Sequence, residues 1–469
     1  MPSTPRETTY ALISLGCPKN VVDSERMAGL LRAGGYRMVV EPEGADFVVV
    51  NTCGFIRDAR EESYGVIREM IELKTQRRLR GVIVAGCLAQ RDKEELLTRF
   101  PEIDQLVGVF GRDEIAAAAG RLGIGGWGLG AVTSPAATES SRADRSTILP
   151  AAPAEALSDD GRLRITLPHL AYLKIAEGCN RLCSFCTIPS IRGPYVSKPI
   201  ERVVVEAEEL AADGVRELIL IAQDTSYYGI DLGGEPQLAE LLRQLDGIDG
   251  LARIRVMYLY PLYITDELVE MIALAEKVVP YLDLPLQHIS DEVLRRMRRG
   301  VTRAEIERLL DRLRGRIDGL VLRTTLIAGF PGETERQFEE LLEFVRARRF
   351  ERLGVFAYSD EPGTPAMGLD GKLSEREIQA RRDRLLSVQQ EIAFGWNELQ
   401  IGRRLDILID RDIPGEEDAY VGRSYADAPE IDGAVYVTGE NLAPGQIIPS
   451  EIVAARGYDL VGVACDPLE

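Results

Sequence analysis

Residues 171–186 read AYLKIAEGCNRLCSFC and decide the fold of the longest part of the chain. The segment opens with a short, mostly aliphatic run over 171–176, which is typical of a buried strand in a parallel sheet. Cys179, Cys183 and Cys186 follow at once, spaced C-x3-C-x2-C. A buried strand that ends in a group of thiols indicates a site at the carboxyl edge of a sheet.

The same strand pattern recurs downstream and alternates with helical patterns. The expected strands are 171–176, 218–222, 254–258, 282–286, 321–328 and 353–358, and the expected helices are 200–212, 237–245, 266–276, 291–298, 303–314 and 335–348. Six β-α units predict an α/β barrel or partial barrel, with its chemistry at the carboxyl ends of the strands. Ser374 and Glu377 fit a capping box at the start of a further long helix.

A second β-α series precedes this one. Aliphatic runs over 10–15, 47–50 and 82–85 are followed by Cys17, Cys53 and Cys87, and then by helical patterns over 23–33, 58–74 and 93–99. The pattern predicts an open α/β domain with all three thiols at one sheet edge, each near a helix start that favours thiolate. A single such cysteine is more often a small buried residue, but three in equivalent turns indicate a metal site.

The remaining segments predict a linker and a small β-barrel. Residues 131–164 contain 19 Ala, Ser, Thr or Pro among 34, which is linker composition, and the GxGxxG stretch at 123–128 fits a hinge. Short strands are expected over 405–409, 419–423, 434–438 and 445–453, the last an edge or broken strand because it contains Pro449. The predicted domains are 8–124, 165–397 and 398–469, with the linker 131–164 between the first two.

Composition limits the classes of function. The 469 residues carry a net charge of −19, so the chain is a poor generic binder of nucleic acid or anionic membrane. The polar start and the lack of a long apolar run predict a cytosolic protein. Two histidines nearly exclude multi-histidine metal sites, and seven cysteines are too few for a disulfide scaffold. Residues 401–469 alone carry five basic and fourteen acidic side chains, a net −9.

The spacing of Cys179, Cys183 and Cys186 predicts a particular kind of cluster. Three thiolates on one loop can bind three corners of a cubane iron–sulfur cluster and leave one iron open to a small molecule. The alternative is a structural zinc loop, but zinc usually takes four ligands, and His169 is the only nearby candidate for the fourth.

This motif, at the end of the first strand of a β-α barrel, resembles that of the radical S-adenosylmethionine superfamily. The resemblance implies that the open iron binds S-adenosylmethionine and that one electron cleaves it to a 5′-deoxyadenosyl radical. It also implies that Phe185 lies near the adenine. Gln223 and Asp224, at the end of the second strand, and Gly329, at the end of the fifth, are implied to help hold the cofactor.

The text around the N-terminal cysteines narrows the resemblance to the methylthiotransferases. Cys17-Pro-Lys-Asn20, Asn51-Thr-Cys53-Gly-Phe55 and Gly86-Cys87-Leu-Ala-Gln90 look like the cluster domain of that family, and the tail looks like its TRAM barrel. The family implies a second [4Fe-4S] cluster, on Cys17, Cys53 and Cys87, that carries the transferred sulfur. These motifs resemble the branch that methylthiolates the β-carbon of an aspartate in small-subunit ribosomal protein S-12.

The acidic tail agrees with that branch, because a basic ribosomal protein is attracted to a barrel of charge −9. The expected partners are S-12, free or in the ribosome, and an electron-donor protein, with no membrane and no DNA. The alternatives are a tRNA adenosine methylthiotransferase and, from another class, a non-catalytic iron–sulfur electron carrier. His288 has no predicted role, and Cys465 is expected to be buried. The arginines at 295, 296, 298 and 299 are expected to form a solvated helix end, with a substrate contact as the alternative.

Overall fold

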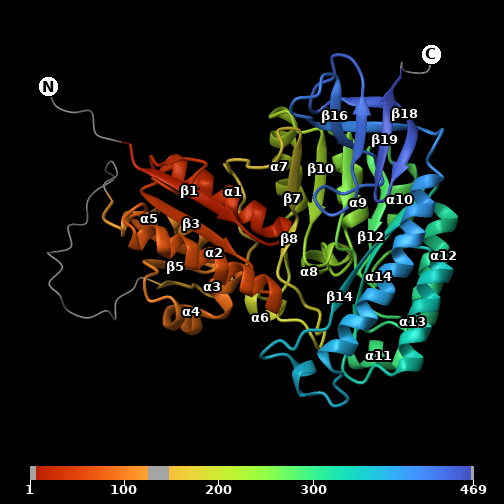
Figure 1. The fold of residues 1–469 in the computed structure, drawn as a ribbon, viewed down its shortest axis with the longest axis horizontal. Coiled ribbons are helices and arrows are strands. Elements are labelled where there is room, and N and C mark those ends of the chain that lie inside the picture. Colours follow the sequence, from red (N-terminus) through yellow and green to blue (C-terminus); the bar gives the residue numbers. More distant parts are fainter. Residues whose placement is uncertain (1–6, 125–146, 466–469) are drawn as a thin grey trace. The chain divides into compact units, whose positions relative to one another are not determined.

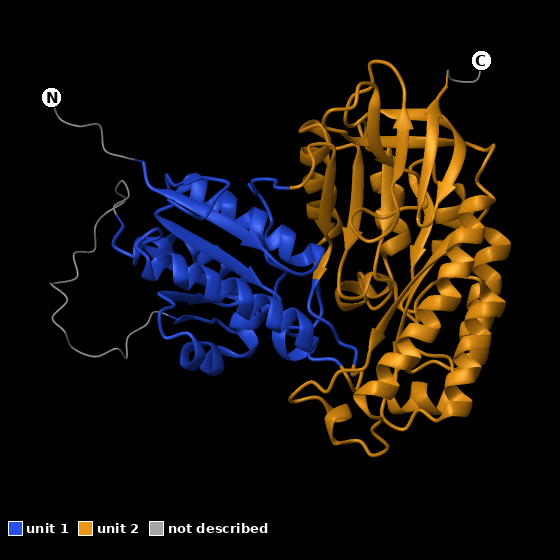
Figure 2. Ribbon diagram, in the orientation of Figure 1, with its two compact units in different colours: residues 1–165, 177–181, 186–196 blue, residues 166–176, 182–185, 197–469 orange. Residues whose placement is uncertain are grey.

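A computed structural model describes residues 7–124 and 147–465 (Figure 1). The chain divides into two compact units (Figure 2). Unit 1 comprises the residues up to 165 together with 177–181 and 186–196, and unit 2 comprises 166–176, 182–185 and the residues from 197 onwards. Across the described residues, every helix is too short or too polar to cross a bilayer.

Unit 1 contains a six-stranded parallel sheet in the order β2-β1-β3-β4-β5-β6. Its strands are β1 (Thr9–Ser14), β2 (Arg37–Met38), β3 (Phe47–Thr52), β4 (Gly81–Gly86), β5 (Gln105–Val107) and β6 (Thr147–Ile148). Its helices are α1 (Pro18–Ala33), α2 (Arg57–Thr75), α3 (Cys87–Arg91), α4 (Lys93–Arg99), α5 (Ile115–Gly120) and α6 (Ile188–Arg192), with a 3-10 turn η1 (Val109–Glu114). The open α/β fold expected for this part is confirmed.

Strand β3 shows why this sheet is buried on both faces. Val48 and Val50 belong to the core beneath α2, whereas Phe47 and Val49 belong to the core on the opposite face. Successive side chains of a strand point to opposite faces, so an uninterrupted apolar run fits only a strand that is covered on both sides.

Part of the expected linker joins unit 1. Residues 131–146 of that linker, and 125–128 of the expected hinge, lie outside the described residues. Thr147–Ile148 forms β6 at the sheet edge. Further along, the Leu163 amide donates to the Glu25 carbonyl at 2.9 Å, and Arg162 forms an ion pair with Glu25 at 3.3 Å. These contacts tie the end of the segment to α1.

Unit 2 contains the second parallel sheet, in the order β14-β13-β12-β11-β10-β7. Its strands are β7 (Leu170–Lys174), β10 (Glu217–Ile221), β11 (Arg253–Val256), β12 (Val278–Asp283), β13 (Val321–Ala328) and β14 (Arg352–Ala357). Its helices are α7 (Ile200–Ala212), α8 (Ile230–Gly233), α9 (Leu238–Asp246), α10 (Asp266–Leu274), α11 (Asp291–Arg296), α12 (Arg303–Arg316), α13 (Glu335–Arg348) and α14 (Glu375–Glu398). The short elements of this unit are η2 (Thr225–Tyr227) and η3 (Pro365–Gly368). Two further short strands, β8 (Ala176–Glu177) and β9 (Val196–Ser197), each have one residue in either unit. The predicted partial barrel of six β-α units is confirmed.

The end of the chain forms a closed five-stranded barrel, as expected for its class, in the order β15-β16-β17-β19-β18. Its strands are β15 (Arg404–Asp412), β16 (Ala419–Arg423), β17 (Val435–Thr438), β18 (Ile447–Arg456) and β19 (Asp459–Ala464). The expectation for Pro449 was wrong, because β18 pairs on both sides, with β15 and with β19. Pro449 lies opposite Asp406 of β15, and its carbonyl accepts a hydrogen bond from the Cys465 amide at 2.9 Å.

A buried ion network joins this barrel to the sheet within unit 2. Arg423 of β16 binds Glu217 of β10 at 2.6 Å and Asp410 of β15 at 2.7 Å. His169 contacts the same Asp410 at 2.9 Å. Burial raises the pKa of Glu217, but Arg423 and the other arginines beside it hold that pKa below its usual value.

Candidate metal centre

The three N-terminal cysteines follow neighbouring strands of one sheet. Strands β1, β3 and β4 are adjacent and in register, with Ser14 opposite Asn51 and Thr52 opposite Gly86. Cys17 comes three residues after β1, whereas Cys53 and Cys87 come directly after β3 and β4. Because the strands are parallel, all three cysteines lie at the carboxyl edge of this sheet, where open α/β folds hold their ligands.

The turns that carry these cysteines pack closely together. Gly16 has φ +90°, and a Cβ placed there would lie 2.7 Å from the Cys53 Cβ and 3.0 Å from its Sγ. A Cβ on Gly54 would lie 2.8 Å from the Leu88 backbone, one residue after Cys87. Any larger side chain at either glycine would push the turns apart, so both positions need glycine.

The three thiols act on one another electrostatically. Burial raises the pKa of Cys53, and negative charge on Cys17 raises it further. Burial also raises the pKa of Cys87 to about 12, and both other thiols add to that rise. A helix start alone therefore does not turn the Cys53 and Cys87 thiols into thiolates.

Asn20, which the sequence analysis named only as the end of a motif, connects the three turns. Its Nδ2 donates to the Leu15 carbonyl and to the Thr52 carbonyl, each at 2.9 Å. Its Oδ1 lies 3.5 Å from the Cys87 Sγ. A buried amide on the first turn of α1 thus contacts the end of each cysteine-bearing strand.

A buried arginine supplies positive charge at this edge. Arg192, at the end of α6 and also in unit 1, is 1% exposed. Its guanidinium donates to Asn20 Oδ1 at 2.7 Å, to Asp23 at 2.9 Å and to Glu177 at 2.8 Å. Burial lowers the pKa of Arg192, but Cys87, Glu177 and the anions near them raise it well above its usual value. Arg192 therefore stays protonated.

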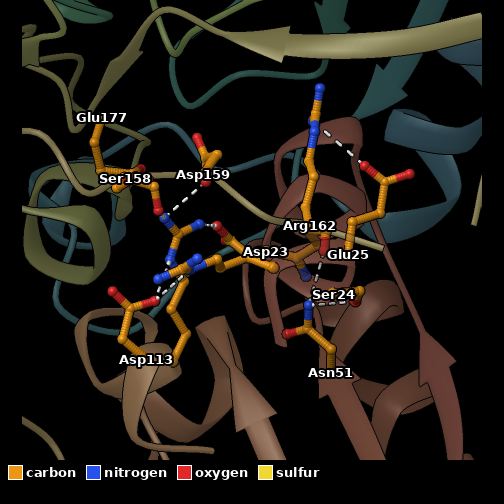
Figure 3. Close-up of polar contacts among 12 residues, drawn as sticks. Asp23, Ser24, Glu25, Asn51, Asp113, Ser158, Asp159, Arg162 and Glu177 are labelled. Atoms are coloured by element: carbon orange, nitrogen blue, oxygen red, sulfur yellow. Dashed lines mark hydrogen bonds and ion pairs between the residues drawn. The ribbon is translucent and has the colours of Figure 1, made fainter. Parts of the chain in front are cut away.

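Asp23 links Arg192 to a second buried guanidinium. Arg112 contacts Asp23 and forms an ion pair with Asp159 at 2.7 Å, while its side chain donates to the Ser158 carbonyl at 2.8 Å (Figure 3). Asn51 donates to Ser24 at 2.8 Å, and both side chains are labelled in Figure 3. Buried charges are retained only when they are paired in this way.

The second cysteine group lies within eight consecutive positions, 179–186. In unit 1, the Arg181 amide lies 3.4 Å from the Cys179 Sγ, and the Ile188 amide lies 3.4 Å from the Cys186 Sγ. In unit 2, the Cys183 thiol is buried and lies 3.6 Å from Nη1 of Arg299. Each of these thiols therefore has an N–H group within sulfur hydrogen-bond distance.

Arg299 corrects the expectation of a solvated helix end after α11. It is 5% exposed, stacks 4.0 Å over the Tyr260 ring and donates to the Pro285 carbonyl at 2.5 Å. Arg296 nearby donates to the Pro331 carbonyl at 3.0 Å. A run of arginines in sequence does not reveal which member turns inward, which is why the pattern misled.

The expected S-adenosylmethionine contacts lie at the strand ends of unit 2. Phe185 packs edge-on against Phe330, with ring centroids 6.3 Å apart. Asp224 follows β10 and is buried, with Ser226 donating to it at 2.6 Å, while Gln223 beside it is half-buried. Gly329 follows β13 with φ +78°, a conformation that glycine adopts without strain.

Glu333, buried and missed by the sequence analysis, fixes the backbone at Gly329. Both of its carboxylate oxygens accept from the Gly329 amide at 3.2 Å. His288 contacts the same carboxylate at 3.2 Å, and Arg381 of α14 contacts it at 2.5 Å. His288 thus has a structural partner, whereas Cys465, expected to be buried, is half-buried with its thiol donating to Pro449.

The N-terminal cysteine edge fits a cubane cluster in its donor set. It offers three thiols on neighbouring turns and a buried cation, and unit 1 itself contains no histidine. Among the described residues, no three His, Cys, Asp or Glu side chains converge so as to share one metal ion. A cubane does not need such convergence, since each thiolate binds a different iron.

Family comparisons divide the chain into three matches. Residues 9–108 match the uncharacterized protein family UPF0004, residues 173–345 match the radical SAM superfamily, and residues 401–465 match the TRAM domain. Among solved structures, the radical S-adenosylmethionine methyltransferase TsrM from Kitasatospora setae is similar in fold, with a TM-score of 0.52 and 18% identity over 77% of this chain and 75% of that one.

Close relatives cover nearly the whole chain. The ribosomal protein uS12 methylthiotransferase RimO of Lachnoclostridium phytofermentans is 45% identical over 96% of this chain and 99% of its own length. The protein of the same name from Symbiobacterium thermophilum is 45% identical over 99% of this chain and 92% of its own length. With this identity along the full length, the chain belongs to the RimO family of radical S-adenosylmethionine methylthiotransferases.

Proposed function

We propose that this chain methylthiolates the β-carbon of an aspartate in ribosomal protein S-12, the substrate that the names of its relatives carry as uS12. The observation that carries the proposal is the identity of 45% along almost the full length of those relatives. It is supported by the placement of Cys17, Cys53 and Cys87 at one sheet edge.

Two [4Fe-4S] clusters are proposed as the cofactors, one on each cysteine triad, together with S-adenosylmethionine. When bound, these groups supply a carbon-centred radical and a sulfur carrier, which is chemistry that no side chain of the protein can provide. An aspartate β C–H bond is too weakly acidic for a carboxylate or histidine base, and the two histidines have structural contacts with Asp410 and Glu333.

The residues of the chain divide this work between them. Cys179, Cys183 and Cys186 would hold the cluster that binds S-adenosylmethionine, and Cys17, Cys53 and Cys87 would hold the cluster that carries sulfur. Phe185, Gln223, Asp224 and Gly329 are proposed to contact S-adenosylmethionine. Glu333 keeps the Gly329 backbone in place through its two hydrogen bonds.

The terminal barrel is proposed to attract the protein substrate. Its segment 401–469 carries a net charge of −9, whereas a surface that binds RNA phosphates is basic. The proposed division of domains assigns 8–124 to the sulfur-carrying cluster, 165–397 to the radical barrel and 398–469 to this acidic barrel. An electron-donor protein completes the proposed partners.

Substrate choice is tested by offering the two candidate substrates separately. The full chain is reconstituted with iron and sulfide without oxygen, supplied with S-adenosylmethionine and a low-potential reductant, and offered purified S-12 or bulk tRNA. Mass spectrometry is expected to find the methylthio group on an aspartate of S-12. A methylthio group on tRNA alone would overturn the proposed substrate and leave a tRNA methylthiotransferase in its place.

A further inference from the structure

Arg192 has contacts that a purely structural ion pair does not require. It stands six residues after Cys186, yet its guanidinium reaches Asn20, the amide that bridges the turns of the other cysteine triad. One donor of the guanidinium binds Glu177 and another is shared between Asn20 and Asp23. This planar fork therefore sets the position of Asn20 relative to Cys87, whose Sγ lies 3.5 Å from the same Oδ1.

The charge of Arg192 acts on the sulfurs as well as on the carboxylates. Arg192 is 1% exposed, and its guanidinium and the Cys87 Sγ lie 2.7 Å and 3.5 Å from the same Asn20 oxygen. The triad therefore lies beside one buried cation, in a region where water does little to screen its charge.

We propose that Arg192 is a positioning residue that raises the reduction potential of the cluster held by Cys17, Cys53 and Cys87. The inference rests on the proposed function, because it requires that this triad holds a cluster. Reduction adds one electron, supplied by an external reductant, and therefore one negative charge to the cluster. A fixed positive charge nearby stabilises the reduced state, and local charge and hydrogen bonds are known determinants of iron–sulfur potentials.

The ion pair between Arg192 and Glu177 separates an electrostatic role from a structural one. Arg192→Gln and Glu177→Gln break the same contact, so a structural role moves both variants in the same direction. Their effects on local charge are opposite, because one removes a positive charge and the other a negative charge. An electrostatic role therefore moves the potential down in Arg192→Gln and up in Glu177→Gln.

The experiment uses the full chain with Cys179, Cys183 and Cys186 all replaced by alanine, so that one cluster remains. Iron and sulfide content is measured first, and the midpoint potential is then measured by an optical and electron-paramagnetic-resonance redox titration. If this parent chain takes up no cluster, the proposed function fails. If it takes up a cluster, the variants test Arg192 separately.

Arg192→Gln is expected to shift the midpoint to lower potential, Arg192→Lys to shift it less, and Glu177→Gln to shift it to higher potential. Arg112→Gln is the matched control. Arg112 also contacts Asp23, but its closest ion pairs are with Asp23 and Asp159 and not with the residues of the cysteine triad. A much smaller shift is expected there.

Shifts of the same sign in Arg192→Gln and Glu177→Gln, or no shift in either, would overturn the inference. If Arg192→Gln fails to load iron, the midpoint potential of Glu177→Gln alone tests the inference. A rise in its potential supports the inference, and an unchanged or lower potential contradicts it.

Discussion

Cys53 follows the middle one of the three cysteine-bearing strands, with Cys17 and Cys87 on the strands to either side. We expect Cys53→Ala to keep cleavage of S-adenosylmethionine by the proposed barrel cluster and to lose methylthio transfer, because its sulfur is proposed to bind the other cluster. Deoxyadenosine is measured by chromatography and the modified S-12 by mass spectrometry. Cys465→Ala, at a cysteine outside both triads, is the control and should keep both activities.

The division of labour between the triads would be contradicted if Cys53→Ala, with a fully loaded barrel cluster, no longer cleaved S-adenosylmethionine.

Gly16 tests whether the close packing of the turns is needed to hold a cluster. Gly16→Ala places a Cβ in a left-handed conformation, which costs about 1–3 kcal/mol, and also 2.7 Å from the Cys53 Cβ. We expect lower stability and a loss of the iron bound by the N-terminal triad. Gly35→Ala has nearly the same strain, with φ +84°, but its Cβ meets nothing within 4 Å. Equal iron loss in the two variants would show that strain, not packing at Cys53, is responsible.

At the residue scale, the sequence predicts the positions of the cysteines better than the groups around them. Three cysteines after three aliphatic runs are visible as a pattern because each run ends at a turn. Asn20, Arg192 and Glu333 carry no such signal, since each also depends on a contact with a residue 32 to 172 positions away. A single polar residue that is buried far from its partners in sequence cannot be recognised without the fold.

Arg381 connects helix α14 to the end of β13. The Arg381 guanidinium binds the buried carboxylate of Glu333, which also contacts the Gly329 amide and His288. Arg381→Met leaves the buried Glu333 carboxylate without its cationic partner. Such a change lowers the free energy of unfolding by about 3–5 kcal/mol. Chemical denaturation of the full chain measures the loss, and weaker S-adenosylmethionine binding in calorimetry should accompany it.

Arg384→Met is the matched control on the same helix. Arg384 pairs with Glu335 and Glu339 at the surface, and exposed pairs contribute little. Similar losses of stability in both variants would contradict the role given to the buried pair.

At the element scale, most helices and strands could be predicted from pattern, and the errors have physical reasons. The capping box at Ser374 and Glu377 begins α14 as expected. Strand β12 was expected over 282–286 but covers Val278–Asp283, and the helix before it, expected over 266–276, ends at Leu274. Strand β19 was missed, and β18 was taken as an edge, since barrel closure joins strands distant in sequence.

Acid should weaken unit 2 through its buried ion network. Burial raises the pKa of Glu217 but the arginines outweigh it, and for Asp410 burial is outweighed by hydrogen bonds with His169 and Arg423. Both carboxylates thus have folded-state pKa values below their usual 4.5 and 3.8. Their stabilising contribution is complete above those usual values and is lost as the pH falls through the lower folded values.

Thermal unfolding of the full chain between pH 7 and pH 3 measures this effect. The midpoint temperature should fall steeply below about pH 4 and less steeply in Glu217→Gln, which lacks one of the linked protons. Identical slopes in the two chains would rule out Glu217 as a source of the acid sensitivity.

At the scale of the whole molecule, the central claim is that two separate cysteine triads each hold a cubane cluster. The most direct test is to measure iron, sulfide and zinc in anaerobically reconstituted chain, with Mössbauer spectra to identify the cluster type. The account predicts two [4Fe-4S] clusters per chain, falling to one when either triad is replaced by alanine. Zinc in place of iron, or a single cluster that either set of replacements abolishes, would contradict it.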